Sequence, residues 1–223
     1  MAIEWLESFE STEMVQELVP GQVMLERMGS MEGREFREVS EIPGLSGNPE
    51  AASEVWHLQE HPMSCAVACQ EFIAEELLSK EFSEAKMRDY AENREWFSDS
   101  GTLMYDVGNL LEEMGLEVER VQGATVEDLK HVLNSGGKAM VAVNNMTLFS
   151  PVYANLPGNP ANHMVEVTGI DERNPKNVKV ILNDPGVENG AGREIELNTF
   201  MAAWNKSNCF MVSVFRPNGG TSL

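Results

Sequence analysis

The order of apolar and polar residues from residue 57 onward predicts a helical part followed by a strand-rich part. Apolar side chains recur at spacings of three and four, which predicts a helix over residues 65–78 with Ser64 as its N-cap. The same pattern predicts helices over residues 102–114, with Gly115 just past the end, and over residues 125–134.

The periodicity changes after the Gly-Gly pair at residues 136–137. Short β-branched runs, separated by Pro, Gly and Asn, predict strands over residues 138–143, 163–170, 177–182, 193–197 and 209–215. A short helix is expected around residues 198–204. Helices first and strands afterwards indicate an α+β domain and not an alternating β-α-β one.

Residues 1–56 have a different composition. They contain twelve Glu, three Arg and no Lys, and residues 40–52 are typical of a linker or surface loop. We therefore expect an acidic N-terminal extension over residues 1–56, one domain over residues 57–217, and a flexible tail over residues 218–223.

The net charge limits the classes of partner. With 16 Lys and Arg against 36 Asp and Glu, the chain carries a formal charge of −20, and this argues against binding nucleic acid or anionic membrane. No apolar run approaches the roughly 20 residues that span a bilayer, so no membrane insertion is expected. The N-terminus lacks the pattern of a signal peptide. A cytoplasmic location is the default, export by a specialised secretion system stays open, and the oligomeric state is not indicated.

The three cysteines are Cys65, Cys69 and Cys209, too few and too unevenly spaced for a disulfide framework. Cys65 stands at a predicted helix N-terminus, where the helix dipole and free N–H groups stabilise a thiolate. A zinc site built from Cys65, Cys69 and a histidine is a weaker reading, because Cys-x3-Cys without a second pair is a poor zinc pattern. We expect no metal and no cofactor.

A thiolate nucleophile needs a general base, and His163 is the best placed of the four histidines. It opens the most regular predicted strand, whereas His57 and His61 flank Cys65 locally and His131 falls within a predicted helix. Asp184 ends the next strand, so it meets His163 if the two strands are antiparallel neighbours, in the manner of a Cys-His-Asp triad. Gln59, six residues before Cys65, is placed to donate to an oxyanion together with the Cys65 backbone N–H.

Several segments resemble one known family. Residues 59–69 read Gln-Glu-His-Pro-Met-Ser-Cys-Ala-Val-Ala-Cys, similar to the Gln-x5-Cys-Gly-x-Ala-Cys signature of the bacterial, bacteriocin-processing peptidases that cut double-glycine leaders. Residues 162–171 resemble the family's His strand, and the Asn-Asp-Pro at residues 183–185 resembles its Asp turn. The ordered set covers about residues 57–217.

The resemblance implies a papain-like fold and a cysteine peptidase acting on a peptide or protein, with Cys65 as nucleophile, His163 as base and acid, Asp184 as orienting group and Gln59 in the oxyanion hole. Ala66 departs from the family's Gly, and no transporter domain follows in this sequence, so we expect a stand-alone relative. Two alternatives remain open at this point. One is a non-catalytic peptide-docking module on the same fold. The other is an acyltransferase or transglutaminase-like enzyme that uses the same triad.

Overall fold

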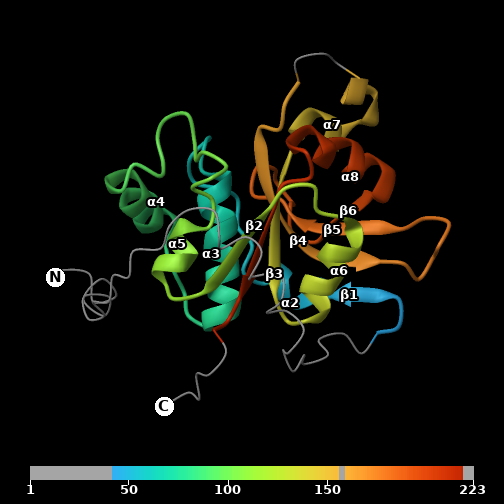
Figure 1. The fold of residues 1–223 in the computed structure, drawn as a ribbon, viewed down its shortest axis with the longest axis horizontal. Coiled ribbons are helices and arrows are strands. Elements are labelled where there is room, and N and C mark those ends of the chain that lie inside the picture. The colour runs from blue at the N-terminus through green and yellow to red at the C-terminus, as the bar shows by residue number, and fades with distance from the viewer. Residues whose placement is uncertain (1–41, 156–158, 218–223) are drawn as a thin grey trace, which may run out of the picture. The chain divides into compact units, whose positions relative to one another are not determined.

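The computed structural model describes residues 42–155 and 159–217, and a seven-stranded antiparallel sheet lies at the centre of this part of the chain (Figure 1). The strand order is β2-β7-β3-β4-β5-β6, and β1 pairs with β4 beside this path. The strands are β1 (Leu45–Gly47), β2 (Glu117–Val121), β3 (Lys138–Val143), β4 (His163–Asp171), β5 (Lys179–Asn183), β6 (Arg193–Glu196) and β7 (Met211–Phe215).

Helices pack on both faces of the sheet. They are α2 (Pro49–Ser53), α3 (Cys65–Leu78), α4 (Glu84–Asn93), α5 (Asn109–Glu113), α6 (Val126–Asn134), α7 (Asn145–Phe149) and α8 (Leu197–Trp204), with 3-10 turns at Pro151–Asn155 and Asn205–Ser207. Along β3, Met140 and Ala142 face the apolar cluster of α3 and α5, whereas Ala139, Val141 and Val143 face the cluster of α6 and α8. Because side chains alternate between the two faces of a strand, β3 contributes to both apolar clusters.

The α+β class expected from the sequence is confirmed, and so are the helices at residues 65–78 and 125–134. The predicted helix over residues 102–114 is wrong in its first half, because the helix α5 begins only after Gly108. Gly108 has a φ of +101°, and a Cβ there would lie 2.7 Å from Val118 Cγ1. A residue in the left-handed conformation interrupts an α-helix, so a helix cannot continue through Gly108.

Residues 42–56 are also more ordered than their composition predicts. β1 pairs with β4 in the register Leu45 to Asp171, and the Asn48 side chain caps α2. The Asn183 side chain donates a 2.8 Å hydrogen bond to the Ala52 carbonyl. This part of the expected extension thus belongs to the central sheet, while residues 1–41 and the tail at residues 218–223 lie outside the described residues.

Between β3 and β4, α7 and a 3-10 turn occupy residues 145–155. In the ranges that the structure describes, no helix combines the length and apolar character needed to cross a membrane.

One buried carboxyl group sits within the sheet. Glu166 on β4 is fully buried and accepts a hydrogen bond of 2.9 Å from Asn183 Nδ2. Its Oε1 and the Oε1 of Glu76 on α3 are both buried without a hydrogen-bond donor among the described residues. Burial first, and then the neighbouring charge of Glu76, raise the pKa of Glu166 well above its ordinary value, although Lys138 opposes this. We infer that Glu166 is held protonated in the fold.

This predicts that the wild-type protein loses stability as pH rises. The folded state binds a proton at Glu166 that the unfolded state releases above a pKa of about 4.3. Between that pH and the raised folded-state pKa, the free energy of unfolding falls by at most about 1.4 kcal/mol per pH unit. In Glu166→Gln this slope should be shallower in urea titrations between pH 5 and 6.5, below the range in which the raised pKa values of His57 and His163 add a slope of the same sign. The exposed strand residue Glu119, changed to Gln, is the control, and equal slopes in all three proteins would contradict the prediction.

Candidate active site

The antiparallel pairing of β4 and β5 brings His163 and Asp184 together. His163 is the first residue of β4 and Asp184 follows the last residue of β5, so the two lie at the same edge of the sheet. His163 Nε2 is 2.7 Å from Asp184 Oδ1. The side chain of His163 is 7% exposed and that of Asp184 is completely buried.

The Asp184 carboxylate is surrounded by donors. Oδ1 also accepts from the Gly186 backbone N–H at 3.0 Å, and Oδ2 accepts from Arg193 Nη1 at 2.8 Å. Burial alone would raise the pKa of Asp184, but the hydrogen bond and charge of His163, with help from Gly186 and Arg193, lower it below its ordinary value. The group is therefore a buried carboxylate, held in one orientation.

Cys65 is the first residue of α3 and is partly exposed. Ser64 occupies the N-cap position, but its hydroxyl makes no capping bond, because it instead contacts His61 O at 2.7 Å and the Glu84 carboxylate at 2.5 Å. Burial alone would raise the pKa of the Cys65 thiol. The hydrogen bond with His163 and the charge of that imidazole outweigh burial, and the pKa of Cys65 is lowered.

His163 links the other two groups. Its Nε2 is engaged by Asp184, which leaves Nδ1 as the ring nitrogen for Cys65. Burial lowers the pKa of the imidazole, but the hydrogen bonds to Asp184 and Cys65 and the charges of both raise it to about 9. A lowered thiol pKa beside a raised imidazole pKa describes a thiolate–imidazolium pair.

Gln59 lies in the loop that leads to Cys65. Its Nε2 donates to the His61 carbonyl at 2.6 Å, and its backbone N–H donates to Pro185 O at 2.9 Å. Its Oε1 is buried without a partner among the described residues. Within that part of the chain, no hydrogen bond joins Gln59 to Cys65, although both belong to the same loop and helix start.

A cleft opens beside Cys65 and His163. Apart from the Cys65–His163 pair, the described residues that line it are mostly apolar or contribute backbone, and none has a charged side chain: Met63, Ala66, Ser100, Gly101, Thr102, Met104, Val107, Ala142, Ala161, Asn162 and Met164. Such a wall suits an uncharged, extended chain approaching the thiol.

The remaining cysteines and histidines have structural environments. Cys69 is buried and its thiol contacts the Met164 carbonyl at 3.5 Å, in keeping with a packing role. Cys209 is buried, His131 is exposed on α6, and the ring of His61 packs edge-on against Phe97.

Sequence reasoning missed three groups around Asp184. Arg193 is the first residue of β6, Trp56 Nε1 donates to the Asp184 carbonyl at 2.9 Å, and Gly186 lies close to Cε1 and Nε2 of the His163 ring. The turn sequence Asp-Pro-Gly was the available signal for Gly186. No sequence signal pointed to Arg193 or Trp56, because only tertiary folding brings them next to Asp184; Trp56 lies 128 residues before it.

A cysteine at a helix N-terminus that meets a histidine and an aspartate from an antiparallel sheet is the arrangement of papain-like peptidase folds, and comparison with solved structures confirms the fold. The peptidase domain of Streptococcus ComA, a bifunctional ABC transporter involved in a quorum sensing pathway, matches with a TM-score of 0.53 at 14% identity, over 73% of this chain and 98% of that domain. A Bacillus anthracis protein described as a C39-like peptidase matches with a TM-score of 0.57 at 14% identity, over 75% and 97%.

The chain thus shares its fold with the peptidase domain of this ABC transporter and with the C39-like protein, and this is the papain-like fold that the sequence resemblance implied. No protein-family model matches it. Among curated proteins, the uncharacterized proteins Rv1268c of Mycobacterium tuberculosis and Mb1299c of Mycobacterium bovis are each 28% identical over 196 residues, covering 75% of this chain and 83% of the relative.

The close approach of Gly186 to His163 gives a testable prediction. A Cβ at residue 186 would lie 2.8 Å from His163 Cε1 and 3.2 Å from Nε2, so Gly186→Ala must displace the ring. We expect iodoacetamide to alkylate Cys65 about tenfold more slowly at pH 6, the effect of a rise of about one unit in the thiol pKa. Glu188→Ala, an exposed change in the same turn, should leave the rate unaltered. A Gly186→Ala protein that reacts at the wild-type rate would contradict this account.

Proposed function

We propose that this chain is a cysteine peptidase, a thiol hydrolase that cuts a peptide or amide bond. The observation that carries the proposal is the linked set Cys65–His163–Asp184, in which one ring nitrogen is 2.7 Å from a buried carboxylate and the imidazole hydrogen-bonds the thiol. The fold shared with peptidase domains supports the same chemistry.

The proposed reaction begins with attack of the Cys65 thiolate on a substrate carbonyl carbon, which forms an S–C bond and an oxyanion. When the tetrahedral intermediate collapses, the C–N bond breaks and the His163 imidazolium gives its proton to the leaving nitrogen. Water then attacks the thioester while His163 takes up a proton. The acid product leaves, and the thiolate–imidazolium pair is restored.

The oxyanion is assigned to two donors. The Cys65 backbone N–H, at the first position of α3, has no carbonyl of its own helix to bond. The Gln59 amide has two N–H groups, of which one is occupied by the His61 carbonyl, so the other remains for the substrate. Removing one such donor typically costs about 10²–10³ in rate.

The substrate is proposed to be an extended segment of a peptide or protein. The cleft wall offers apolar side chains and the backbone of residues 100–102, which accommodate a main chain and uncharged side groups. Acyl transfer to an amine would use the same residues, and no feature of the cleft favours it over hydrolysis.

The pKa directions predict the pH dependence. Alkylation of Cys65 should be fast at pH 6, where an ordinary thiol with a pKa of about 8.5 is almost unreactive, because the pKa of Cys65 is lowered. Turnover of a peptide pool should fall as pH passes about 9, where His163 loses the proton needed by the leaving nitrogen, while alkylation stays fast. Mass spectrometry of each cysteine in wild type and in His163→Ala checks this. A Cys65 that behaves like a free thiol in both would remove the proposal in favour of a docking module.

Asp184→Asn tests the role of the carboxylate. The substitution keeps a hydrogen-bond acceptor but removes the charge that helps to raise the pKa of His163, so the alkaline limb of turnover should move below pH 9. At pH 8 we expect turnover to fall by about tenfold, part of what a general acid contributes. An unmoved limb would show that the charge of Asp184 does not govern the imidazole.

A further inference from the structure

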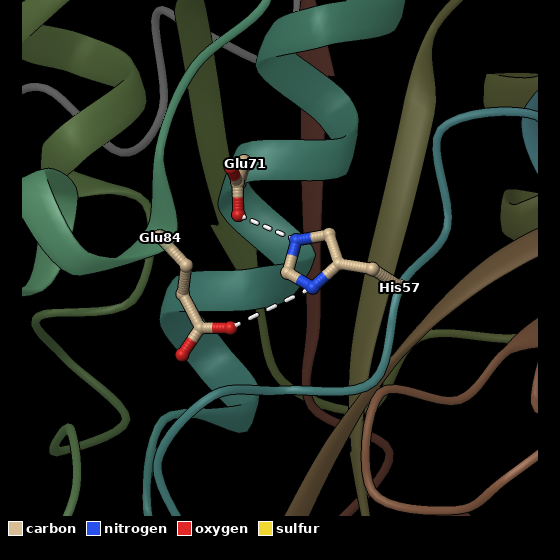
Figure 2. Close-up of side chains that lie close together, drawn as sticks. All are labelled: His57, Glu71 and Glu84. Carbon is tan, nitrogen blue, oxygen red and sulfur yellow. Dashed lines mark hydrogen bonds and ion pairs between the residues drawn. The ribbon is translucent and has the colours of Figure 1, made fainter.

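We call residues 57–64, which lead to Cys65, the nucleophile loop. His57 of this loop and two glutamates from the neighbouring helices form a charged cluster. Figure 2 shows His57 between Glu71 of α3 and Glu84 of α4. His57 Nε2 is 2.8 Å from Glu71 Oε2, and Nδ1 is 3.9 Å from Glu84 Oε2. The side chains of Glu71 and Glu84 are 5% and 0% exposed, so two carboxylates are buried here.

The cluster has the composition of a metal site, but its hydrogen bonds describe an ion pair. His57 Nε2 meets a carboxylate, and Nδ1 meets the Leu58 carbonyl at 3.0 Å. The Leu58 carbonyl can only accept, and Glu71 accepts when it is ionised, so beside an ionised Glu71 both ring nitrogens donate and the ring is an imidazolium. Burial raises the pKa of Glu71, and the hydrogen bond and charge of His57 oppose that rise. The hydrogen bond to Glu71 raises the pKa of His57 to about 9 despite partial burial.

The buried carboxylates hold the nucleophile loop at three points. Besides His57, the Glu60 backbone N–H donates to Glu84 Oε2 at 2.8 Å, and the Ser64 hydroxyl lies 2.5 Å from Glu84 Oε1. Ser64 directly precedes Cys65. The other side of the loop is attached near the triad, through the bond from the Gln59 backbone to Pro185 O.

We infer that His57, Glu71 and Glu84 form an ionic anchor that positions the nucleophile loop, so that the Gln59 amide and the Cys65 N–H are in place to bind an oxyanion. His57 is in this sense a positioning residue and touches no substrate. The inference rests on the proposed function, since it concerns the oxyanion site of the same reaction. It leaves the thiolate–imidazolium pair to His163 and Asp184.

Charged groups face the anchor from each packed element, and the acidic ones outnumber the basic ones. Glu71 and Glu75 face it from α3, Glu84 and Arg88 from α4, and Glu60 from the loop, with Arg88 Nη1 3.9 Å from both Glu84 Oε1 and Glu60 Oε2. Without His57, the buried Glu71 would lose the hydrogen bond and the charge that oppose the effect of burial on its pKa, and no other cation lies within hydrogen-bond distance of it among the described residues. Glu71 and the loop would then rearrange.

The test compares two small reagents on the whole chain. Iodoacetamide requires only the thiolate, whereas p-nitrophenyl acetate acylates Cys65 through an oxyanion, and Cys65→Ala gives the background for both. In His57→Phe, which preserves an edge-on ring against Phe72, we expect acylation to slow by about tenfold, a part of the loss typical of a missing oxyanion donor. Alkylation should stay within about twofold of wild type, since His57 lies outside the thiolate–imidazolium pair.

Two further variants separate positioning from general destabilisation. Gln59→Ala should also slow acylation alone, and adding His57→Phe to it should cost nothing more, because the anchor acts through Gln59. Glu84→Gln is a second way to weaken the anchor if the first variant folds poorly, and Glu92→Gln, exposed on the same helix, is the matched control.

The outcomes separate this inference from the proposed function. If wild-type Cys65 forms no acyl-enzyme, both fail. If wild type acylates and the anchor variants match it, or lose acylation and alkylation equally, the anchor inference alone is overturned. Selective loss of acylation, without further loss in the double variant, supports it.

Discussion

The burial of the Asp184 carboxylate is the constraint on which the site depends. A charge removed from water needs donors on every side, and here they come from His163, the Gly186 backbone and Arg193. Each donor belongs to a different piece of structure: the start of β4, the turn after β5, and the start of β6. Satisfying one carboxylate therefore aligns three segments of the sheet edge.

Arg193, the cation that binds Asp184 Oδ2, is itself held by a second contact. The Arg193 guanidinium lies 4.7 Å from the centre of the Phe149 ring, so it is fixed by an aromatic face of α7 as well as by the carboxylate. Cys65, His163, Asp184 and Arg193 form a row of four neighbouring groups with alternating charge: thiolate, imidazolium, carboxylate and guanidinium. Alternation lowers the energy of every member, which is how ionised groups persist in a site with little access to water.

Much of this arrangement could be predicted from the sequence because it is local. The period of apolar residues marked α3, the alternation over residues 163–168 marked β4, and an Asn-Asp-Pro turn marked the end of β5. The assumption that these two strands are antiparallel neighbours was then enough to place His163 beside Asp184. What failed were features decided by tertiary contact: Gly108 in left-handed conformation against Val118, and an acidic, proline-containing stretch that becomes β1 and α2.

The bond between the Trp56 indole and the Asp184 carbonyl spans 128 positions of the chain. During synthesis, Cys65 is made soon after Trp56, but its histidine and aspartate follow roughly a hundred residues later. The thiol consequently has an ordinary, weakly reactive character on the growing chain, since nothing yet lowers its pKa. Contacts between distant segments form late in folding. The lowered pKa of the thiol is thus an outcome of completed folding, because it needs groups that are added to the chain about a hundred residues after Cys65.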